Sequence, residues 1–138
     1  MTTSQLMAEL RSRLSRIATI DTFCRDNFGK GLTVLRHYDD NNPPGASVNP
    51  WAHLELLGDR KSNTSREVMR TVMLTCSVWR DPDSDVDDGA DLVSDLRELA
   101  EKALMAPGLG KVETGDDVFG NAEGGCFDNV STIIITNK

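Results

Sequence analysis

The amino-acid sequence predicts an α+β domain in which two amphipathic helices flank a mainly antiparallel sheet of about four to five strands. Apolar residues recur at helical spacing near the N-terminus and again after residue 88. The other periodic stretches show the two-residue alternation of strands. The predicted order is helix, three strands, helix, two strands (α-β-β-β-α-β-β). No internal repeat or composition shift marks a boundary, so we expect one domain over residues 1–138.

The first helix is expected over about residues 4–18. Thr3 or Ser4 is available as its N-cap, and the β-branched segment IATIDT (17–22) is expected to end it. Its opposite face is charged, as is typical of a helix that packs on a core and faces water. The apolar positions at helical spacing are Leu6, Leu10, Leu14 and Ile17.

Three strands are expected next. GLTVLRHY (31–38) is typical of a short strand, and DDNNPPGASVNP (39–50) of a turn-rich loop that we expect to be mobile. Alternation at 51–57 predicts a second strand, and GDRKSNTS (58–65) a polar hairpin connection. The longest strand pattern is REVMRTVMLTCSVWR (66–80).

The long strand has two faces of different character. One is apolar, and the other is only mildly polar, whereas an exposed strand face more often carries charges. This indicates that the second face is buried, either by another subunit or by the chain's own second helix, and the sequence leaves both alternatives open. The first face carries Val68, Val72, Leu74, Cys76 and Val78, and the second carries Met69, Thr71, Met73, Thr75, Ser77 and Trp79.

Six aspartates lie within the stretch WRDPDSDVDDGADL (79–92). An EF-hand calcium loop needs a glycine at its sixth position and a glutamate at its twelfth. Counted from Asp81, these positions hold Val86 and Leu92, and the register from Asp83 fails as well. The segment is therefore expected to be a solvated connector rather than a metal site.

The second helix is expected directly after this connector. Asp88 is expected to be its N-cap, with Asp91 three residues later as in a capping box and Asp87 near the positive end of the helix. Pro107 and Gly108 end it. Its apolar stripe consists of Leu92, Leu96, Leu99, Ala100, Ala103 and Leu104.

The C-terminal part predicts two more strands. GLGKVETGDD (108–117) is typical of a short strand and a turn. The glycine-rich segment that follows gives a second expected mobile loop near 115–126. The β-branched run FDNVSTIIITNK (127–138) predicts a terminal strand.

Charge and cysteine content argue against several classes of protein. A net charge of −7 and a pI near 4.7 disfavour a protein that grips nucleic acid phosphates, although nucleic acid can slide past such a surface. Three widely separated cysteines predict no disulfide framework and a reducing compartment. The N-terminus lacks the apolar region of a signal peptide, and no apolar run is long enough to span a bilayer. We therefore expect a soluble, cytoplasmic protein.

No catalytic or metal-binding constellation is legible. His37 and His53 have no zinc-ligand spacing with the cysteines, and we expect them to be structural strand residues. Arg25 beside Cys24 modestly favours a thiolate, but no Cys–His pair is evident. The common nucleophile and nucleotide-binding motifs are missing. We expect no enzymatic activity, no metal and no cofactor.

The layout resembles the small tail terminator proteins (tail-completion or minor tail proteins) of tailed phages, of the lambda type. The resemblance is one of pattern and length over nearly the whole chain. The turn-rich loop at 39–50 and the six-aspartate connector have no evident counterpart in the family pattern, so their roles stay open. Three features carry the resemblance: the N-terminal helix SQLMAELRSRLSRI, the strand MRTVMLTCSVWRDPDSD leading into the helix ADLVSDLRELAEKALM, and the glycine-rich acidic stretch before FDNVSTIIITNK.

The resemblance implies a homo-oligomeric ring, usually a hexamer, at the head-proximal end of the virion tail. Such a ring is made in the host cytoplasm, docks on the tail tube protein and stops tube polymerisation. It then joins the head–tail connector or another neck protein. DNA passes through it without sequence-specific binding, and no membrane is involved.

A closed ring needs two different patches on each subunit. We expect Met69, Met73 and Trp79 at a subunit interface, because methionine and aromatic residues are favoured in interface cores. The alternative is a small acidic adaptor that uses the same sheet face to hold a cellular protein. Lumen or docking loops are expected to carry Asp81, Asp83, Asp85, Asp116, Asp117 and Glu123.

Overall fold

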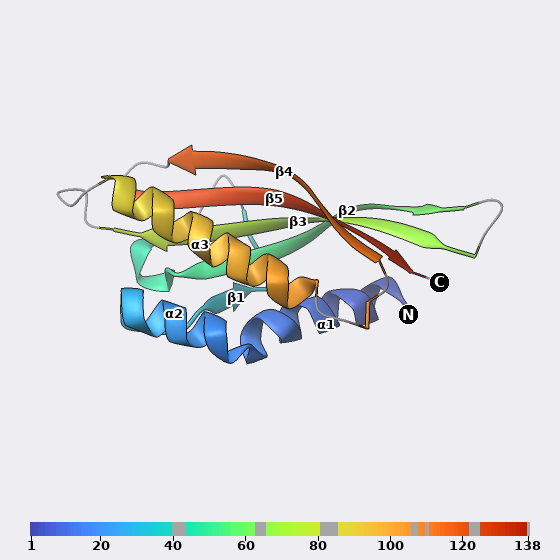
Figure 1. Cartoon of the computed structure of the whole chain (residues 1–138), viewed down its shortest axis with the longest axis horizontal. Helices are drawn as coiled ribbons and strands as arrows, with labels where there is room; N and C mark the ends of the chain where they lie inside the picture. Colours follow the sequence, from blue (N-terminus) through green and yellow to red (C-terminus); the bar gives the residue numbers. More distant parts are fainter. Residues whose placement is uncertain are drawn as a thin grey trace.

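Helices pack on one face of a five-stranded sheet, which confirms the predicted α+β class (Figure 1). The computed structural model describes residues 1–39, 44–62, 66–80, 86–105, 108–109, 111–121 and 125–137. Within these residues the chain forms three α-helices, a 3₁₀ turn and five strands. In chain order they are α1 (Thr3–Arg16), α2 (Ala18–Phe28), β1 (Thr33–Leu35), η1 (Ala46–Val48), β2 (Trp51–Lys61), β3 (Val68–Trp79), α3 (Val86–Leu104), β4 (Lys111–Asn121) and β5 (Cys126–Asn137).

The strand order of the sheet is β1-β2-β3-β5-β4. β1 is parallel to β2, and the other described pairs are antiparallel, so the sheet is mixed but mainly antiparallel as predicted. The central strands β3 and β5 pair along their whole lengths. β1 pairs only with residues 51–53 of β2, so the remainder of β2 has no described strand on its outer side.

The first helical region differs from the prediction. α1 begins with Thr2 as its N-cap, in a capping box with Gln5, and ends just before Ile17, which has extended backbone (φ −75°, ψ 117°). A further helix, α2, then runs through the segment expected to end the first one. Burial explains why α2 forms, because Ile20 and Cys24 lie one helical turn apart and are fully buried. This packing outweighs the modest helix propensity of β-branched residues.

α3 is the predicted second amphipathic helix, but it begins at Val86. Its apolar stripe packs on β3 and β5, and Leu99 at the margin of the stripe is only partly buried. Gly89 permits a close approach to β5, because a Cβ at this position would lie 2.3 Å from the ring of Phe127. The buried members of the stripe are Leu92, Leu96, Ala100, Ala103 and Leu104.

β4 is longer than predicted. We expected a short strand, a turn and a mobile loop near 115–126, whereas β4 extends from Lys111 to Asn121. Between Thr114 and Asp117 its register against β5 shifts, because three steps along β4 match two along β5. This bulge takes up the Gly-Asp pair that the sequence pattern presents as a turn. The other expected loop, 39–50, contains η1.

The two faces of β3 are as different as predicted. The helices lie on one side of the sheet and leave the opposite side uncovered (Figure 1). The alternative that the chain's own second helix buries the mildly polar face is therefore wrong, because α3 packs on the other side. The side that the helices cover carries the fully buried residues Val72, Leu74, Cys76 and Val78.

Candidate interaction surfaces

One half of the sheet face opposite the helices is covered by the chain itself. The ring of Tyr38 lies against Trp51 and His53, with centroids 4.9 Å and 5.7 Å away. Trp51 pairs with Ser77 and His53 with Thr75, and all four of these residues are buried. Tyr38, which follows β1, therefore covers this face of the sheet at Trp51 and His53.

The other half of this face, toward the β2–β3 hairpin, is accessible. Met69 is 37% exposed, and Met73 is half-buried. Leu57, at the bulge of β2, is 53% exposed nearby. Register places Met73 between Glu55 and Thr132. We term this surface the open face; it consists of Glu55, Met69, Thr71, Met73, Thr132 and Ile134.

The structure brings together only two of the three residues expected at an interface. Met69 and Met73 point to the same side of β3. Thr71 lies between them on this side, two residues from each. Trp79 shares this side but lies six residues beyond Met73, roughly 20 Å along the strand. It is half-buried where β3 meets the start of β5, next to Gly125. Trp79 is therefore not part of the open face.

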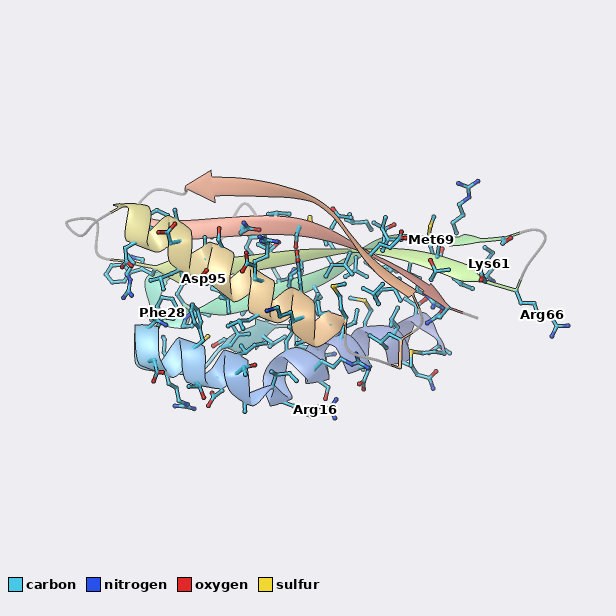
Figure 2. All side chains as sticks on the ribbon, viewed as in Figure 1. Arg16, Phe28, Lys61, Arg66, Met69 and Asp95 are labelled. Atoms are coloured by element: carbon cyan, nitrogen blue, oxygen red, sulfur yellow. The ribbon has the colours of Figure 1, made fainter. Side chains whose placement is uncertain are left out.

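The sheet has two open edges in the described part of the chain. On β2 the outer edge is unpaired from about residue 54 to 61, and at the other side of the sheet β4 is the last strand. Unpaired edge backbone groups readily pair with another strand. The β2–β3 hairpin extends beyond the remainder of the molecule, with Lys61 and Arg66 near its tip (Figure 2). Met69 pairs with Arg60, next to the last pair of the hairpin, Lys61 and Val68.

The acidic connector begins from a fixed point at Arg80. Its Nη1 donates to the carbonyl of Asn27 (3.0 Å), and its guanidinium lies over the ring of Phe28, 5.2 Å from the centroid. Its Nε also lies 3.1 Å from Oδ2 of Asp88. This contact is an ion pair and not a well-aligned hydrogen bond. Arg80 thus joins the end of β3 to the last turn of α2 and the first turn of α3.

The predicted capping role of Asp88 is wrong. Because α3 begins at Val86, Asp88 lies inside its first turn and pairs with Arg80, and Asp91 lies a turn further on. Asp116 and Asp117, expected in a loop, lie in β4, and their side chains are outside the described part of the structure. The remaining acidic candidates, Asp81, Asp83, Asp85 and Glu123, also fall outside the described residues.

A cavity of about 330 Å³ opens between α1, the end of β1 and the open edge of β2. Its lining combines basic and aromatic side chains with the apolar Met7, Leu54 and Leu56, on a protein whose net charge is −7. Sequence analysis missed it, because Arg11 and the residues after β1 meet only when α1 packs beside β2. We term it the basic cavity; its polar lining residues are Arg11, Arg36, His37, Tyr38, His53 and Glu55.

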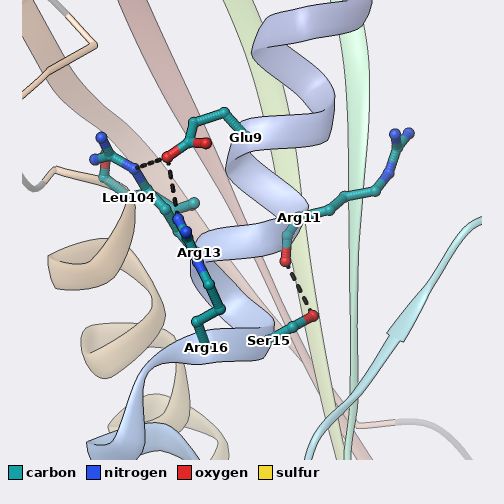
Figure 3. A network of polar contacts seen from close by, with 6 residues as sticks. All are labelled: Glu9, Arg11, Arg13, Ser15, Arg16 and Leu104. Atoms are coloured by element: carbon teal, nitrogen blue, oxygen red, sulfur yellow. Dashed lines mark hydrogen bonds and ion pairs between the residues drawn. The ribbon is translucent and has the colours of Figure 1, made fainter.

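Arg11 differs from the neighbouring arginines of α1. Arg13 and Arg16 both contact Oε1 of Glu9, at 3.1 Å and 3.2 Å, and Arg13 also donates to the carbonyl of Leu104. Figure 3 shows these two side chains converging on Glu9, while Arg11 points away from them. Among the described residues the Arg11 guanidinium has no hydrogen-bond or ion-pair partner, and its Nε is shielded from water.

The three thiols carry no sign of reactivity. Burial, assisted by Asp21, raises the pKa of Cys24 to about 12, which outweighs the modest effect expected of Arg25. Arg25 does not offset this, because it pairs with Asp21 at 3.0 Å. Burial followed by Glu101 raises the pKa of Cys76 to about 12, and burial also raises that of Cys126.

The chain matches no protein-family profile, and no curated protein is significantly similar to it in sequence. Among the described residues, no group of three or more His, Cys, Asp and Glu side chains is placed to hold a metal ion. None of the described helices has the length and apolar character needed to cross a membrane.

Proposed function

We propose that this protein is a structural part of a phage virion, a tail terminator that assembles into a ring, most simply of six copies. The ring caps the tail tube, stops tube polymerisation and joins the tail to the head connector. Two kinds of support stand behind the proposal: the order and length of the elements, which resemble that family, and an accessible sheet face beside two unpaired edges.

The observation that carries the proposal is the open face. Met69 and Met73 lie on a sheet face that no described helix of the chain covers. Water contact of such a face is unfavourable, and a second copy that covers it removes apolar area from water at about 25 cal/mol per Å². Methionine side chains adapt to irregular partners, which suits a surface made for contact.

Ring closure needs a head-to-tail contact between two different patches. The open face with the β2 edge lies on one side of the sheet, and β4 lies at the other edge. The open edge of β2 and the edge formed by β4 differ in sequence and in the length of unpaired strand. A contact between them is therefore heterologous. The net charge of −7 favours passage of DNA, because an acidic lumen repels phosphate.

Native mass spectrometry of the purified chain, over a range of concentrations, tests the proposal. The expected result is a discrete ring-sized oligomer, with a ring and central hole in negative-stain images. Addition of substoichiometric ring to a polymerising tail tube protein is expected to shorten the tubes. A strict monomer at high concentration, or tubes of unchanged length, would overturn the assignment and favour an adaptor.

A further inference from the structure

The open edge of β2 can accept an added strand, and the basic cavity lies at one end of this edge. The N–H of Thr33 in β1 donates to the carbonyl of Pro50 at 3.0 Å, so alternate residues from Pro50 onward direct their backbone groups to the side of β1. This alternation continues to Leu54 and Leu56, which lie beyond the last residue paired with β1 and line the cavity. The backbone groups of Leu56 therefore face an incoming strand.

The charges at the cavity determine the direction of the added strand. β1 occupies the outer edge as far as His53, so a segment that pairs with residues 54–61 has one end beside the cavity. A segment antiparallel to β2 places its carboxyl end there, and a parallel segment places its amino end there. The lining contains Arg11 and Arg36, against Glu55 as the one acidic residue of the described lining. The two cations attract a terminal carboxylate and repel a terminal ammonium group, which favours the antiparallel segment.

Arg11 suits a carboxylate better than Arg36 does. Arg36 is exposed, whereas Arg11 is half-buried and its Nε is shielded from water. Charge pairs gain strength as they lose contact with water, and a guanidinium holds a carboxylate through two parallel hydrogen bonds. Figure 3 shows that Arg11 points away from Glu9, on which Arg13 and Arg16 converge. We therefore expect Arg11 to be the principal ligand of the carboxylate and Arg36 to add exposed positive charge.

The cavity also favours an apolar last residue. Its apolar wall is formed by Met7, Leu54 and Leu56, of which Met7 and Leu54 are buried. A residue added opposite Leu54 or Leu56 directs its side chain to the same side of the sheet, because neighbours across a strand pair share a face. The volume of about 330 Å³ is at the lower end of the range for small-ligand sites, which suits the end of a chain.

The last described strand of a second copy does not fit as the occupant. β5 extends to Asn137, which pairs with Val68 of β3. The side chain of Asn137 accepts a hydrogen bond from Nη1 of Arg70 at 3.0 Å. Arg70 also donates to the hydroxyl of Thr3 and to the carbonyl of Met1. A second copy would have to release this part of its central sheet to fill the cavity.

We propose that the basic cavity binds the C-terminal end of a different protein, which adds to the open edge of β2 as an antiparallel strand. Its terminal carboxylate pairs with Arg11 and Arg36, and its apolar last side chain packs on Met7, Leu54 and Leu56. The inference does not rest on the proposed function, because a single folded copy carries all of these contacts. The proposed ring contact uses the same edge of β2, so the two kinds of binding exclude each other.

Fluorescence anisotropy tests the inference at protein concentrations where the chain is a single copy. The probe is the peptide Ser-Thr-Val-Thr-Thr-Val, labelled at its amino end and with a free carboxyl end. Its C-terminally amidated form is expected to bind roughly tenfold more weakly or worse, the scale of a lost desolvated charge pair. N-methylation of one set of alternate residues is expected to block binding, whereas N-methylation of the other set leaves it unchanged, because only one edge of the peptide faces β2.

Variants separate the role of Arg11 from the general charge of the surface. Arg11→Gln is expected to weaken binding of the free-carboxyl peptide roughly tenfold and to leave binding of the amidated peptide unchanged, since the lost pair includes the carboxylate. Arg25→Gln is the matched control, because Arg25 is an exposed arginine of α2 that pairs with Asp21. It is expected to leave the binding of both peptides unchanged.

Three results would overturn the inference. They are no binding of either peptide, equal binding of the acid and the amide, and equal losses for Arg11→Gln and Arg25→Gln. Tighter binding of a short oligonucleotide than of the free-carboxyl peptide would also overturn it and assign the cavity to nucleic acid. If Arg11→Gln unfolds the chain in a urea titration, the comparison of acid and amide on the unaltered protein decides. None of these results bears on the ring, which the oligomeric state tests.

Discussion

The ring of Phe127 occupies the space that a side chain on Gly89 would need. A Cβ built on Gly89 lies 2.3 Å from Cε2 of Phe127, a distance that no real contact reaches. The first turn of α3 therefore lies directly on β5, and the same turn carries Asp88, the partner of Arg80. This single contact sets the height of α3 above the sheet at the end where the acidic connector begins.

Gly89→Ala is expected to destabilise the fold by about 1–3 kcal/mol, because overpacking against an aromatic ring outweighs the roughly 1 kcal/mol that alanine gains in helix propensity. Urea unfolding gives the change. Gly45→Ala, with no atom within 4 Å of its Cβ, is the control and should stay within about 0.5 kcal/mol. Phe127→Leu in the Gly89→Ala background should recover part of the loss, and strictly additive losses would contradict the direct contact.

Arg80→Ala is expected to cost about 1–2 kcal/mol, since it removes the hydrogen bond to Asn27 and the contact with Phe28 together with the ion pair. Asp88→Asn removes only the ion pair, and because Asp88 is half exposed the expected cost is about 0.5 kcal/mol or less. The comparison by urea unfolding uses Arg25→Ala, in an exposed pair, as control. Equal losses for Arg80→Ala and Arg25→Ala would show that Arg80 does not join the three elements.

Cys76→Ala is expected to reduce the alkaline sensitivity of the fold. Burial holds the pKa of Cys76 at about 12, above the ordinary value of 9.0. Below about pH 9 the thiol is protonated in both the folded and the unfolded chain, so the free energy of unfolding does not depend on it. Between about pH 9 and pH 12 only the unfolded thiol ionises, so the free energy of unfolding falls as the pH rises. The free energy of unfolding, measured from about pH 8 to about pH 11, should fall less steeply in the variant. Parallel curves for the two proteins would exclude this role.

Met73→Asp and Met69→Asp are expected to weaken self-association roughly tenfold or more, because each places a charge in the open face that a neighbouring copy covers. Monomer stability should change little at Met69, which is already 37% exposed. Met105→Asp is the matched control, since Met105 is 46% exposed at the end of α3 and lies outside the open face. Sedimentation velocity reports the association.

The opposite pattern at these methionines would place them in the monomer core. In that case Met73→Asp would lower the melting temperature while the oligomer distribution stayed as it was. Trp79→Ala separates the two cases further. Because Trp79 is half-buried beside Gly125 and distant from the open face, we now expect its loss to affect folding more than assembly.

Periodicity predicted those elements whose burial is regular. Leu6, Leu10 and Leu14 recur at helical spacing and are buried as expected, and the alternation in β3 divides its two faces correctly. α2 escaped prediction because its β-branched residues have weak helix propensity and only tertiary burial of Ile20 and Cys24 favours the helix. The length of β4 was not predicted, because the strand continues past a Gly-Asp pair by forming a bulge there.

The sequence by itself determined the α+β class, the two faces of the long strand and the acidic character of the connector, because each depends on residue type at a local spacing. Only the tertiary structure decided that the helices share one side of the sheet, that Arg80 anchors the connector, and that Arg11 meets Arg36 and His37 beside an open edge. These are contacts between residues distant in sequence. They depend on how elements pack, and no local pattern encodes that.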